Sequence, residues 1–306
     1  MSSLAGNPVA PVAQVQSKRA SSEVGVRVKP QKSRRRLSLG QLARHAFLLG
    51  IVALVVLPFV WMALGSFKTY GDLINRPGLP PEPFTMANYE EVFAQAGFAS
   101  ALANSVFVAV GRVIFACATS VILGYIFAKY RFFGREVLFL LLLSTMLIPF
   151  GAILVPLYLT MSKLQLLDSV SGLVVISLFS TFGVFLLRQW ISGIPDAYME
   201  AARMDGASEW WIIWRIIVPL SGPPLAALAI FTFLGSWDDF LLPSIVLSDP
   251  QVKTVPLALN GLKSLFLERY EIFAAGAMIT VVPVMVLYTF MQKHFVRGLT
   301  FGGIKE

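Results

Sequence analysis

Charged residues and cysteine are both scarce in this 306-residue chain. Only 14% of its residues are Asp, Glu, Lys or Arg, whereas a soluble globular domain carries about 25%. The mean hydropathy is +0.72, so the composition excludes an ordinary soluble globule and indicates a chain that lipid surrounds. The single cysteine, Cys117, excludes an internal disulfide and a cysteine metal cluster.

Motifs for catalysis are also missing. The two histidines, His45 and His294, lie far apart in the chain beside basic residues, which gives no cluster for a metal ion or for acid–base chemistry. No Gly-x-x-x-x-Gly-Lys-Ser/Thr loop occurs, because the "GLKS" at 261–264 lacks the required spacing. The sequence therefore predicts a non-enzyme with no catalytic residues, no metal and no cofactor.

Long apolar stretches are the feature that the chain has in abundance. Each is close to the twenty or so residues that an α-helix needs to cross a bilayer, and backbone groups inside lipid must be satisfied within the segment. The sequence therefore predicts an all-α integral membrane protein with six transmembrane helices. The predicted spans are 44–66, 100–128, 137–160, 171–191, 220–246 and 271–293.

The distribution of Lys and Arg predicts the orientation of these spans. Eighteen basic side chains lie in the segments on the side of the amino terminus, and six lie on the opposite side. Because the more basic side is cytoplasmic, both termini and residues 192–219 are predicted inside. The net charge of +8 is then a consequence of topology, so membrane lipid is an expected partner and nucleic acid is not. Residues 1–43 are predicted to form a disordered basic cytoplasmic arm.

The charged segment "EAARMDGASEWWIIWR", residues 200–215, lies between the fourth and fifth predicted spans. Asp196 and Ser208 are expected to cap two short helices, and Gly206 can take the left-handed conformation that ends the first of them. The three-and-four spacing predicts that four side chains of the second helix share a face against the membrane or the bundle. They are Trp210, Ile213, Trp214 and Ile217.

The segment also contains several small residues. Alanines flank Gly206 and are ringed by charges, which would allow another backbone to approach closely. One interpretation is an amphipathic linker that floats at the interface, and the other is a docking surface for a second protein. The pattern alone leaves both open.

The same segment resembles the cytoplasmic signature loop of the inner-membrane permeases of bacterial ATP-binding cassette importers. The resemblance extends to "NSVFVAVGRV", "LRQWISGIPDAYMEAA", "AIFTFLGSWDDFLLPSIVLSD" and "FVRGLTFGGIKE", and it covers most of residues 80–306. It is strongest with the carbohydrate branch, in particular with the smaller, six-span permease of the maltose transporter. The chain departs from that pattern in its long basic arm and in the order Pro219-Leu220.

The resemblance implies a subunit of a binding-protein-dependent, ATP-driven sugar importer. In this arrangement residues 44–99 hold the first span and an outer loop, 100–296 the permease domain with the coupling loop 192–219, and 297–306 a cytoplasmic tail. The implied partners are a second permease subunit, two ATPase subunits, an extracytoplasmic solute-binding protein and a sugar. The residues implied to dock on the ATPase are Glu200, Ala201, Ala202, Asp205, Gly206 and Ala207.

Other functions remain open from the sequence. A permease for an amino acid, a peptide or an anion would share the coupling loop, a channel or scaffold would need no ATPase, and an integral-membrane enzyme would use charges at the midplane. Three charged residues are predicted at that depth: Arg112, Asp238 and Asp239. A charge there is costly, so Arg112 is expected to approach one of the two aspartates and to line or gate a pathway. The alternative is that Arg112 pairs with a partner subunit or with backbone carbonyls.

Overall fold

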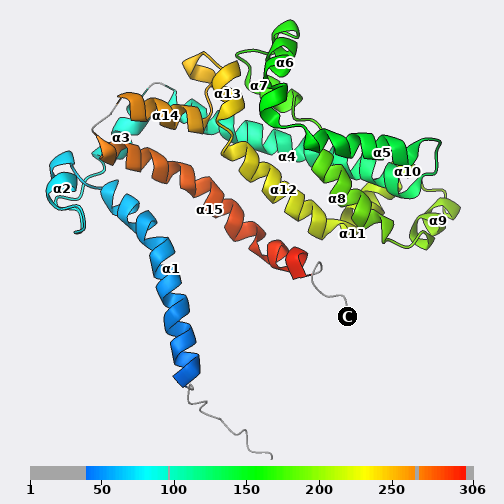
Figure 1. Cartoon of the computed structure of the whole chain (residues 1–306), viewed down its shortest axis with the longest axis horizontal. Helices are drawn as coiled ribbons and strands as arrows, with labels where there is room; N and C mark the ends of the chain where they lie inside the picture. Colours follow the sequence, from blue (N-terminus) through cyan, green and yellow to red (C-terminus); the bar gives the residue numbers. More distant parts are fainter. Residues whose placement is uncertain (1–38, 96, 266–268, 301–306) are drawn as a thin grey trace, which may run out of the picture. The chain divides into compact units, whose positions relative to one another are not determined.

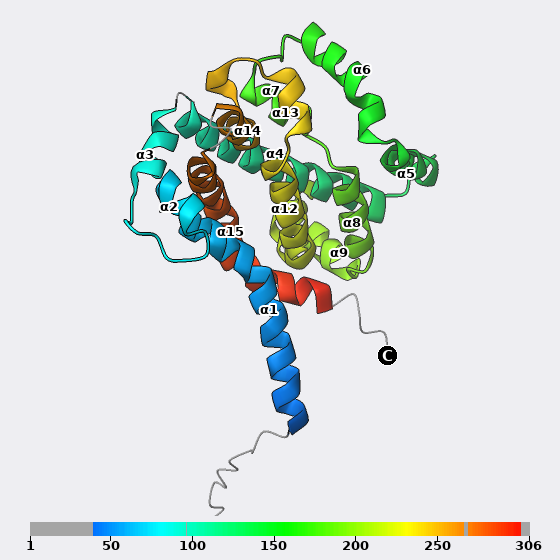
Figure 2. The ribbon, with the colours of Figure 1, turned by 60° about the vertical axis from the view of Figure 1, so that its left-hand side comes forward.

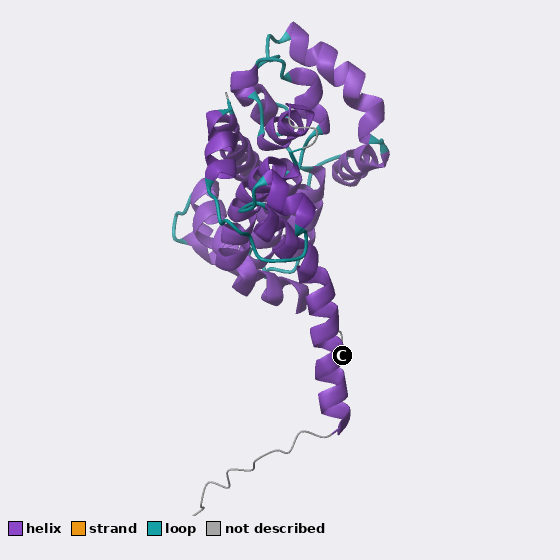
Figure 3. Ribbon diagram, turned by 90° about the vertical axis from the view of Figure 1, so that its left-hand side faces the viewer, coloured by secondary structure: helices purple, strands orange, loops and turns teal. Residues whose placement is uncertain are grey.

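The computed structural model describes residues 39–95, 97–265 and 269–300, and every regular element within these ranges is a helix (Figures 1 and 3). The chain divides into two units, residues 1–52 and 53–306, and the described part of the first unit belongs to α1. The elements, in order, are α1 Leu39–Gly65, α2 Tyr70–Asn75, α3 Ala87–Ala94, α4 Phe98–Lys129, α5 Arg135–Ser144, η1 Thr145–Leu147, α6 Phe150–Lys163, α7 Val170–Val175, α8 Thr181–Ser192, α9 Ala197–Met204, α10 Glu209–Ile212, the π-helix η2 Ile213–Ile217, α11 Val218–Leu220, α12 Gly222–Trp237, α13 Leu241–Val246, η3 Pro250–Val252, α14 Val255–Leu265 and α15 Tyr270–Thr300.

Helices long and apolar enough to cross a membrane occur in the amino-terminal, central and carboxy-terminal parts of the described chain. Three qualify alone: Ala43–Gly65, Phe98–Lys129 and Tyr270–Phe290. Two bent pairs qualify if each counts as one span, Arg135–Leu147 with Phe150–Lys163 and Glu209–Leu220 with Gly222–Trp237. Length and composition therefore give three to five spans among the described residues.

The prediction of six uninterrupted helices is wrong in the middle of the chain. The third predicted span bends by 101° between Leu147 and Phe150, because Pro149 disfavours helical backbone at the preceding residue, and Ile148 has a ψ of 117°. The fourth is divided into α7 and α8, where the hydroxyl of Ser180 caps α8 by accepting the Gly183 amide at 3.0 Å. In the fifth predicted span, helix α12 ends at Trp237 and the next helix, α13, begins only at Leu241.

The boundaries of the first and last predicted segments also differ from the structure. Helix α1 begins at Leu39, so five residues of the predicted 1–43 arm are helical, while residues 1–38 lie outside the described residues. Helix α15 continues to Thr300, past the predicted end of the sixth span at 293. The last six residues of the predicted tail, 301–306, are likewise outside the described residues.

Helix α4 is the central element of the second unit, and it packs against α7, α8, α12 and α14 (Figure 2). Two glycines allow α4 and α8 to approach closely. A Cβ atom on Gly124 would lie 2.8 Å from Cβ of Leu187, and one on Gly183 would lie 2.1 Å from Oγ of Ser120. Any side chain at either position would force the two helices apart.

Polar side chains of α4 satisfy backbone groups where the neighbouring segments are not α-helical. Thr119 Oγ1 donates to the carbonyl of Leu178 at 3.0 Å, between α7 and α8. Asn104 Nδ2 donates to the carbonyls of Gln251 and Lys253 at 2.9 and 3.0 Å. Irregular backbone at membrane depth is tolerated only where protein or water satisfies it, so Thr119 of α4 helps to make the interruption between α7 and α8 possible.

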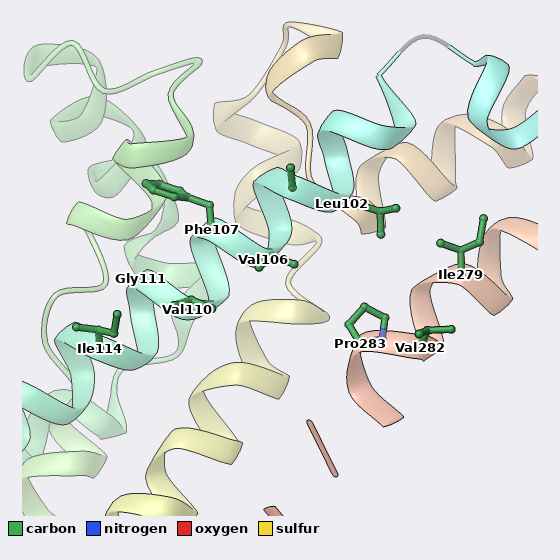
Figure 4. Close-up of a pocket in the computed structure, with 10 residues that line it drawn as sticks. Leu102, Val106, Phe107, Val110, Gly111, Ile114, Ile279, Val282 and Pro283 are labelled. Carbon is green, nitrogen blue, oxygen red and sulfur yellow. The ribbon is translucent and has the colours of Figure 1, made fainter. Parts of the chain in front are cut away.

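A large apolar surface remains uncovered in the isolated chain. An open hollow of about 860 Å³ lies between α4 and α15 and is lined almost entirely by apolar side chains (Figure 4). Its lining includes Phe107 and Val110 of α4 and Val282 of α15, which are about half exposed. Exposed apolar surface of this extent is expected of a chain that lipid or another subunit covers.

Candidate functional site

The segment that the sequence singled out forms an elbow, which we define as residues 197–220. Helix α9 ends at Met204, Gly206 has a φ of +81°, and Ser208 begins α10 by accepting the Trp211 amide at 3.3 Å. The predicted helix–glycine–helix geometry is therefore observed. The left-handed conformation at Gly206 disfavours any residue with a Cβ.

The carboxylate of Asp196 does not cap α9 as predicted. It accepts a hydrogen bond from Lys129 Nζ at 2.6 Å instead, and no side-chain cap is present at Asp196. This hydrogen bond from the ammonium group lowers the pKa of the Asp196 carboxyl. Because Lys129 also donates to the carbonyl of Ile194, the last residue of α4 holds the chain where it enters the elbow.

The buried face of the second elbow helix differs from the predicted one. A π-helical turn at Ile213–Ile217 shifts the register, so Ile213 and Ile217 are buried while Trp210 and Trp214 are 59% and 46% exposed. The isoleucines pack into a cluster with the carboxy-terminal half of α4, together with α8 and α12. The exposed tryptophans remain free to meet lipid headgroups.

The small residues also divide between two faces. Ala202 is only 8% exposed and packs into the same cluster, although it also lines the hollow on the other side of α9 described next. Of the residues predicted to dock on an ATPase, Glu200, Ala201, Asp205 and Gly206 are exposed, and Ala207 is half-buried. An open hollow of about 720 Å³ runs between α9 and α10 and includes Ala201, Gly206 and Trp211 in its lining.

A polar network joins the elbow to α4. Tyr125 is buried and its hydroxyl donates to Glu209 Oε2 at 2.8 Å, while Arg203 Nε donates to Glu209 Oε1 at 2.8 Å. Arg203 Nη2 also donates to the Tyr125 hydroxyl at 3.2 Å, and the carboxylate of Glu209 raises the pKa of Arg203. Sequence analysis did not identify Tyr125, because 84 residues separate it from Glu209 and no local pattern marks the contact.

Replacing Tyr125 with phenylalanine is expected to loosen the elbow without unfolding the bundle. The change removes the two hydrogen bonds of the hydroxyl to Glu209 and Arg203, and a hydrogen bond to a charged group contributes about 1.5–3 kcal/mol. Hydrogen–deuterium exchange of residues 197–212 should therefore accelerate at least about tenfold. Tyr198→Phe is the matched control, because Tyr198 is 56% exposed. Equal exchange in both variants would contradict the anchoring role.

The second candidate site lies around Arg112 in the middle of α4. Arg112 Nη1 is 3.0 Å from Asp239 Oδ2, and Nε donates to the carbonyl of Leu173 at 3.2 Å. Arg112 is 7% exposed, and its Nη2 has no hydrogen-bond partner among the described residues. Of the two predicted aspartate partners, Asp239 is the one that pairs with Arg112. The alternative prediction of a backbone carbonyl partner is met as well, by Leu173. Asp238 is exposed and joins no ion pair in the part of the chain that the structure describes.

The breaks in the neighbouring segments create this site. Asp239 lies between α12 and α13, and the carbonyl of Leu173 lies in α7, which ends at Val175. A charge at this depth needs partners, and an uninterrupted helix would have used the Leu173 carbonyl for its own hydrogen bond.

The fold and these sites define a class of protein. The described residues form an all-helical, multi-pass membrane protein with charged side chains among its membrane-spanning helices and a two-helix elbow beyond the end of α8. Comparison with known proteins narrows the class. Residues 120–301 match the family "Binding-protein-dependent transport system inner membrane component". The chain belongs to this family.

Individual relatives are permease subunits of transport systems. The chain is 36% identical to the arabinooligosaccharides transport system permease protein of Halalkalibacterium halodurans, over 83% of this chain and 93% of that protein. It is 31% identical to the osmoprotective compounds uptake permease protein of Synechocystis, over 86% of this chain and 91% of that protein.

A solved structure agrees with this assignment. A chain from a bacterial ABC transporter involved in the import of the acidic polysaccharide alginate has a TM-score of 0.74 and 25% identity, covering 83% of this chain and 95% of that one. The present chain is therefore a permease subunit of an ABC importer.

Proposed function

We propose that the chain forms half of the translocation pathway of a binding-protein-dependent sugar importer and that its elbow couples this pathway to a separate ATPase. The exposed hollow of the elbow is the observation that carries the coupling role. Small residues such as Ala201 and Gly206 in its lining leave room for the surface of another protein. The buried isoleucines and the Tyr125–Glu209–Arg203 network connect the same element to α4. A linker that only floats on lipid needs neither feature.

The proposal includes the full architecture and its partners. Six spans cross the membrane, with the bent pairs and the α7–α8 segment counted as spans, and both termini and the coupling loop 192–219 are cytoplasmic. Residues 1–43 and 297–306 form the arm and the tail, 44–99 the first span and outer loop, and 100–296 the permease domain. The partners are a second permease subunit, two ATPase subunits and an extracytoplasmic solute-binding protein.

The composition of the purified complex tests this function. Affinity purification of the tagged chain from its own cells should recover an ATPase, and the purified complex should hydrolyse ATP faster when a sugar-loaded binding protein is added. Recovery of the chain without an ATPase would favour a channel or scaffold. Stimulation by an amino acid, peptide, anion or osmoprotectant instead of a sugar would favour the second candidate, which the Synechocystis relative supports by its name.

The proposed orientation predicts which positions react from outside. In a chain with Cys117 replaced by serine, a cysteine at Ser248 should react with an impermeant thiol reagent in intact cells. Ser248 is exposed between α13 and η3. A cysteine at Phe133, fully exposed in the turn between α4 and α5, should react only after the cells are opened. The opposite pattern would refute the topology.

A further inference from the structure

One face of α12 carries an unusual set of exposed residues. Phe231 and Gly235 of α12 and Asp238, the C-cap residue that directly follows it, have helical spacing of four and three residues, and all three are exposed. Nothing lies within 4 Å of the position that a Cβ on Gly235 would occupy. The ring of Phe231 contacts Phe182 of α8 edge-on, with centroids 6.3 Å apart. We call this face, formed by Phe231, Gly235 and Asp238, the α12 stripe.

The position of Arg112 sets the depth of this stripe. Fourteen residues of α4 precede Arg112 and seventeen follow it, so it lies about 21 Å from one end of the helix and about 25 Å from the other. Half of the hydrocarbon layer is only about 15 Å thick. Since Asp239 pairs with Arg112, its neighbour Asp238 also lies deep within the membrane.

A carboxylate at this depth restricts what the stripe can face. Asp239 already neutralises Arg112, and Asp238 joins no ion pair within the described residues. An ionised side chain in contact with lipid costs at least about 2.5–3.5 kcal/mol on insertion scales, so such groups face water-filled cavities or partners. In a protein whose family transports solutes, an exposed deep carboxylate beside open space at Gly235 indicates a wet pathway.

We propose that Asp238 is a selectivity determinant of the translocation pathway, which admits neutral or cationic saccharides and disfavours anionic ones such as uronates. This inference rests on the proposed function. An ionised carboxylate only accepts hydrogen bonds, so it suits sugar hydroxyl and ammonium groups and repels a second carboxylate. The exposed ring of Phe231 offers an apolar surface to the C–H face of a sugar, and Gly235 leaves room between the two.

Charged thiol reagents measure the electrostatic effect of Asp238 directly. Cysteine is placed at Gly235 in a chain whose Cys117 is replaced by serine, and the whole complex is reconstituted in vesicles with ATP and binding protein. The reaction rates of a cationic trimethylammonium methanethiosulfonate and of an anionic sulfonate methanethiosulfonate are compared. The same pair of rates is then measured in the Asp238→Asn background.

The ratio of cationic to anionic rate should fall about tenfold when Asp238 becomes asparagine. Side chains three residues apart on a helix are separated by about 5–6 Å, and Coulomb's law in water gives a factor of about three for each reagent at that distance. A cysteine in place of Leu54, an exposed apolar residue of α1, is the control. Its reaction rate measures how fast the reagents label a side chain that faces lipid.

Two results would overturn the inference. Gly235→Cys that reacts with neither reagent would mean that the stripe faces lipid or a subunit interface, and an unchanged rate ratio in Asp238→Asn would mean that the carboxylate does not act on the pathway. Either result in a complex that retains its ATPase refutes this inference alone. Absence of an ATPase from the complex refutes the proposed function instead.

Discussion

Replacing Arg112 with methionine is expected to reduce the amount of folded chain in the membrane more than any other single change considered for this protein. The substitution leaves Asp239 and the carbonyl of Leu173 without their donor. Breaking a buried ion pair by removing one partner costs about 3–5 kcal/mol. Asp239→Leu should cause a loss of similar size, because it leaves the guanidinium with one backbone carbonyl. Fluorescence-detected size exclusion of the solubilised chain measures both losses.

The double variant Arg112→Met with Asp239→Leu should be less damaged than the sum of the two single changes. Removing both charges eliminates the uncompensated buried charge that each single variant contains. The Leu173 carbonyl still loses its donor, so recovery should be partial. For the same reason a charge swap between residues 112 and 239 should recover less than the wild-type level, since an aspartate at 112 cannot donate to Leu173.

Asp238 provides the matched control for this cycle. It is adjacent to Asp239 but joins no ion pair within the described chain. The coupling between Arg112→Met and Asp238→Leu should therefore be smaller than the coupling between Arg112→Met and Asp239→Leu. The opposite result would be non-additive effects for the Arg112 and Asp238 variants and additive effects for the Arg112 and Asp239 variants. It would show that the functional pairing differs from the one in this structure.

Replacing Ala201 with tryptophan is expected to lower solute uptake at least about fivefold while the chain remains in the membrane at its normal level. Ala201 lines the elbow hollow and is exposed on α9, so the bulky ring should fill the space that an ATPase occupies in the proposed docking. Overpacking of this kind costs about 1–3 kcal/mol, equivalent to about 5- to 150-fold in docking affinity. Uptake into cells and recovery of the ATPase with the tagged chain are the measurements.

Two variants separate docking from folding in this experiment. Ala201→Ser keeps the side chain small and should behave as wild type. Ala202→Trp should instead lower the amount of folded chain, because Ala202 is buried in the cluster with α4 and α8. Normal uptake and normal ATPase recovery in Ala201→Trp would mean that the elbow is an interfacial linker.

The sequence predicted those features that depend on short-range patterns. Gly206 takes the left-handed conformation after α9, and Ser208 caps α10 three residues before Trp211. Both roles depend only on near neighbours, so residue type and spacing predicted them. The register of the second elbow helix was mispredicted, since a π-helical turn at Ile213–Ile217 has no marker in a 3.6-residue repeat.

Contacts between distant segments were harder to predict. Asp196 looked like a helix cap, but Lys129, 67 residues away, takes its carboxylate. Arg112 pairs with Asp239 and not with Asp238 because of the break between α12 and α13. Hydropathy could not predict this break, since the region is one apolar run in the sequence. Apolar length shows that a segment can cross the membrane, whereas the interruptions depend on donors such as Thr119 that α4 provides.

Uptake by reconstituted vesicles tests the central claim most directly. The complex purified through this chain is placed in vesicles with ATP on the side of the elbow and with a binding protein loaded with radiolabelled sugar on the other side. The account predicts sugar accumulation that requires both ATP and the binding protein and that falls at least about fivefold with Ala201→Trp but not with Ala201→Ser. Accumulation that persists without ATP, or that is equal in the two variants, would contradict it.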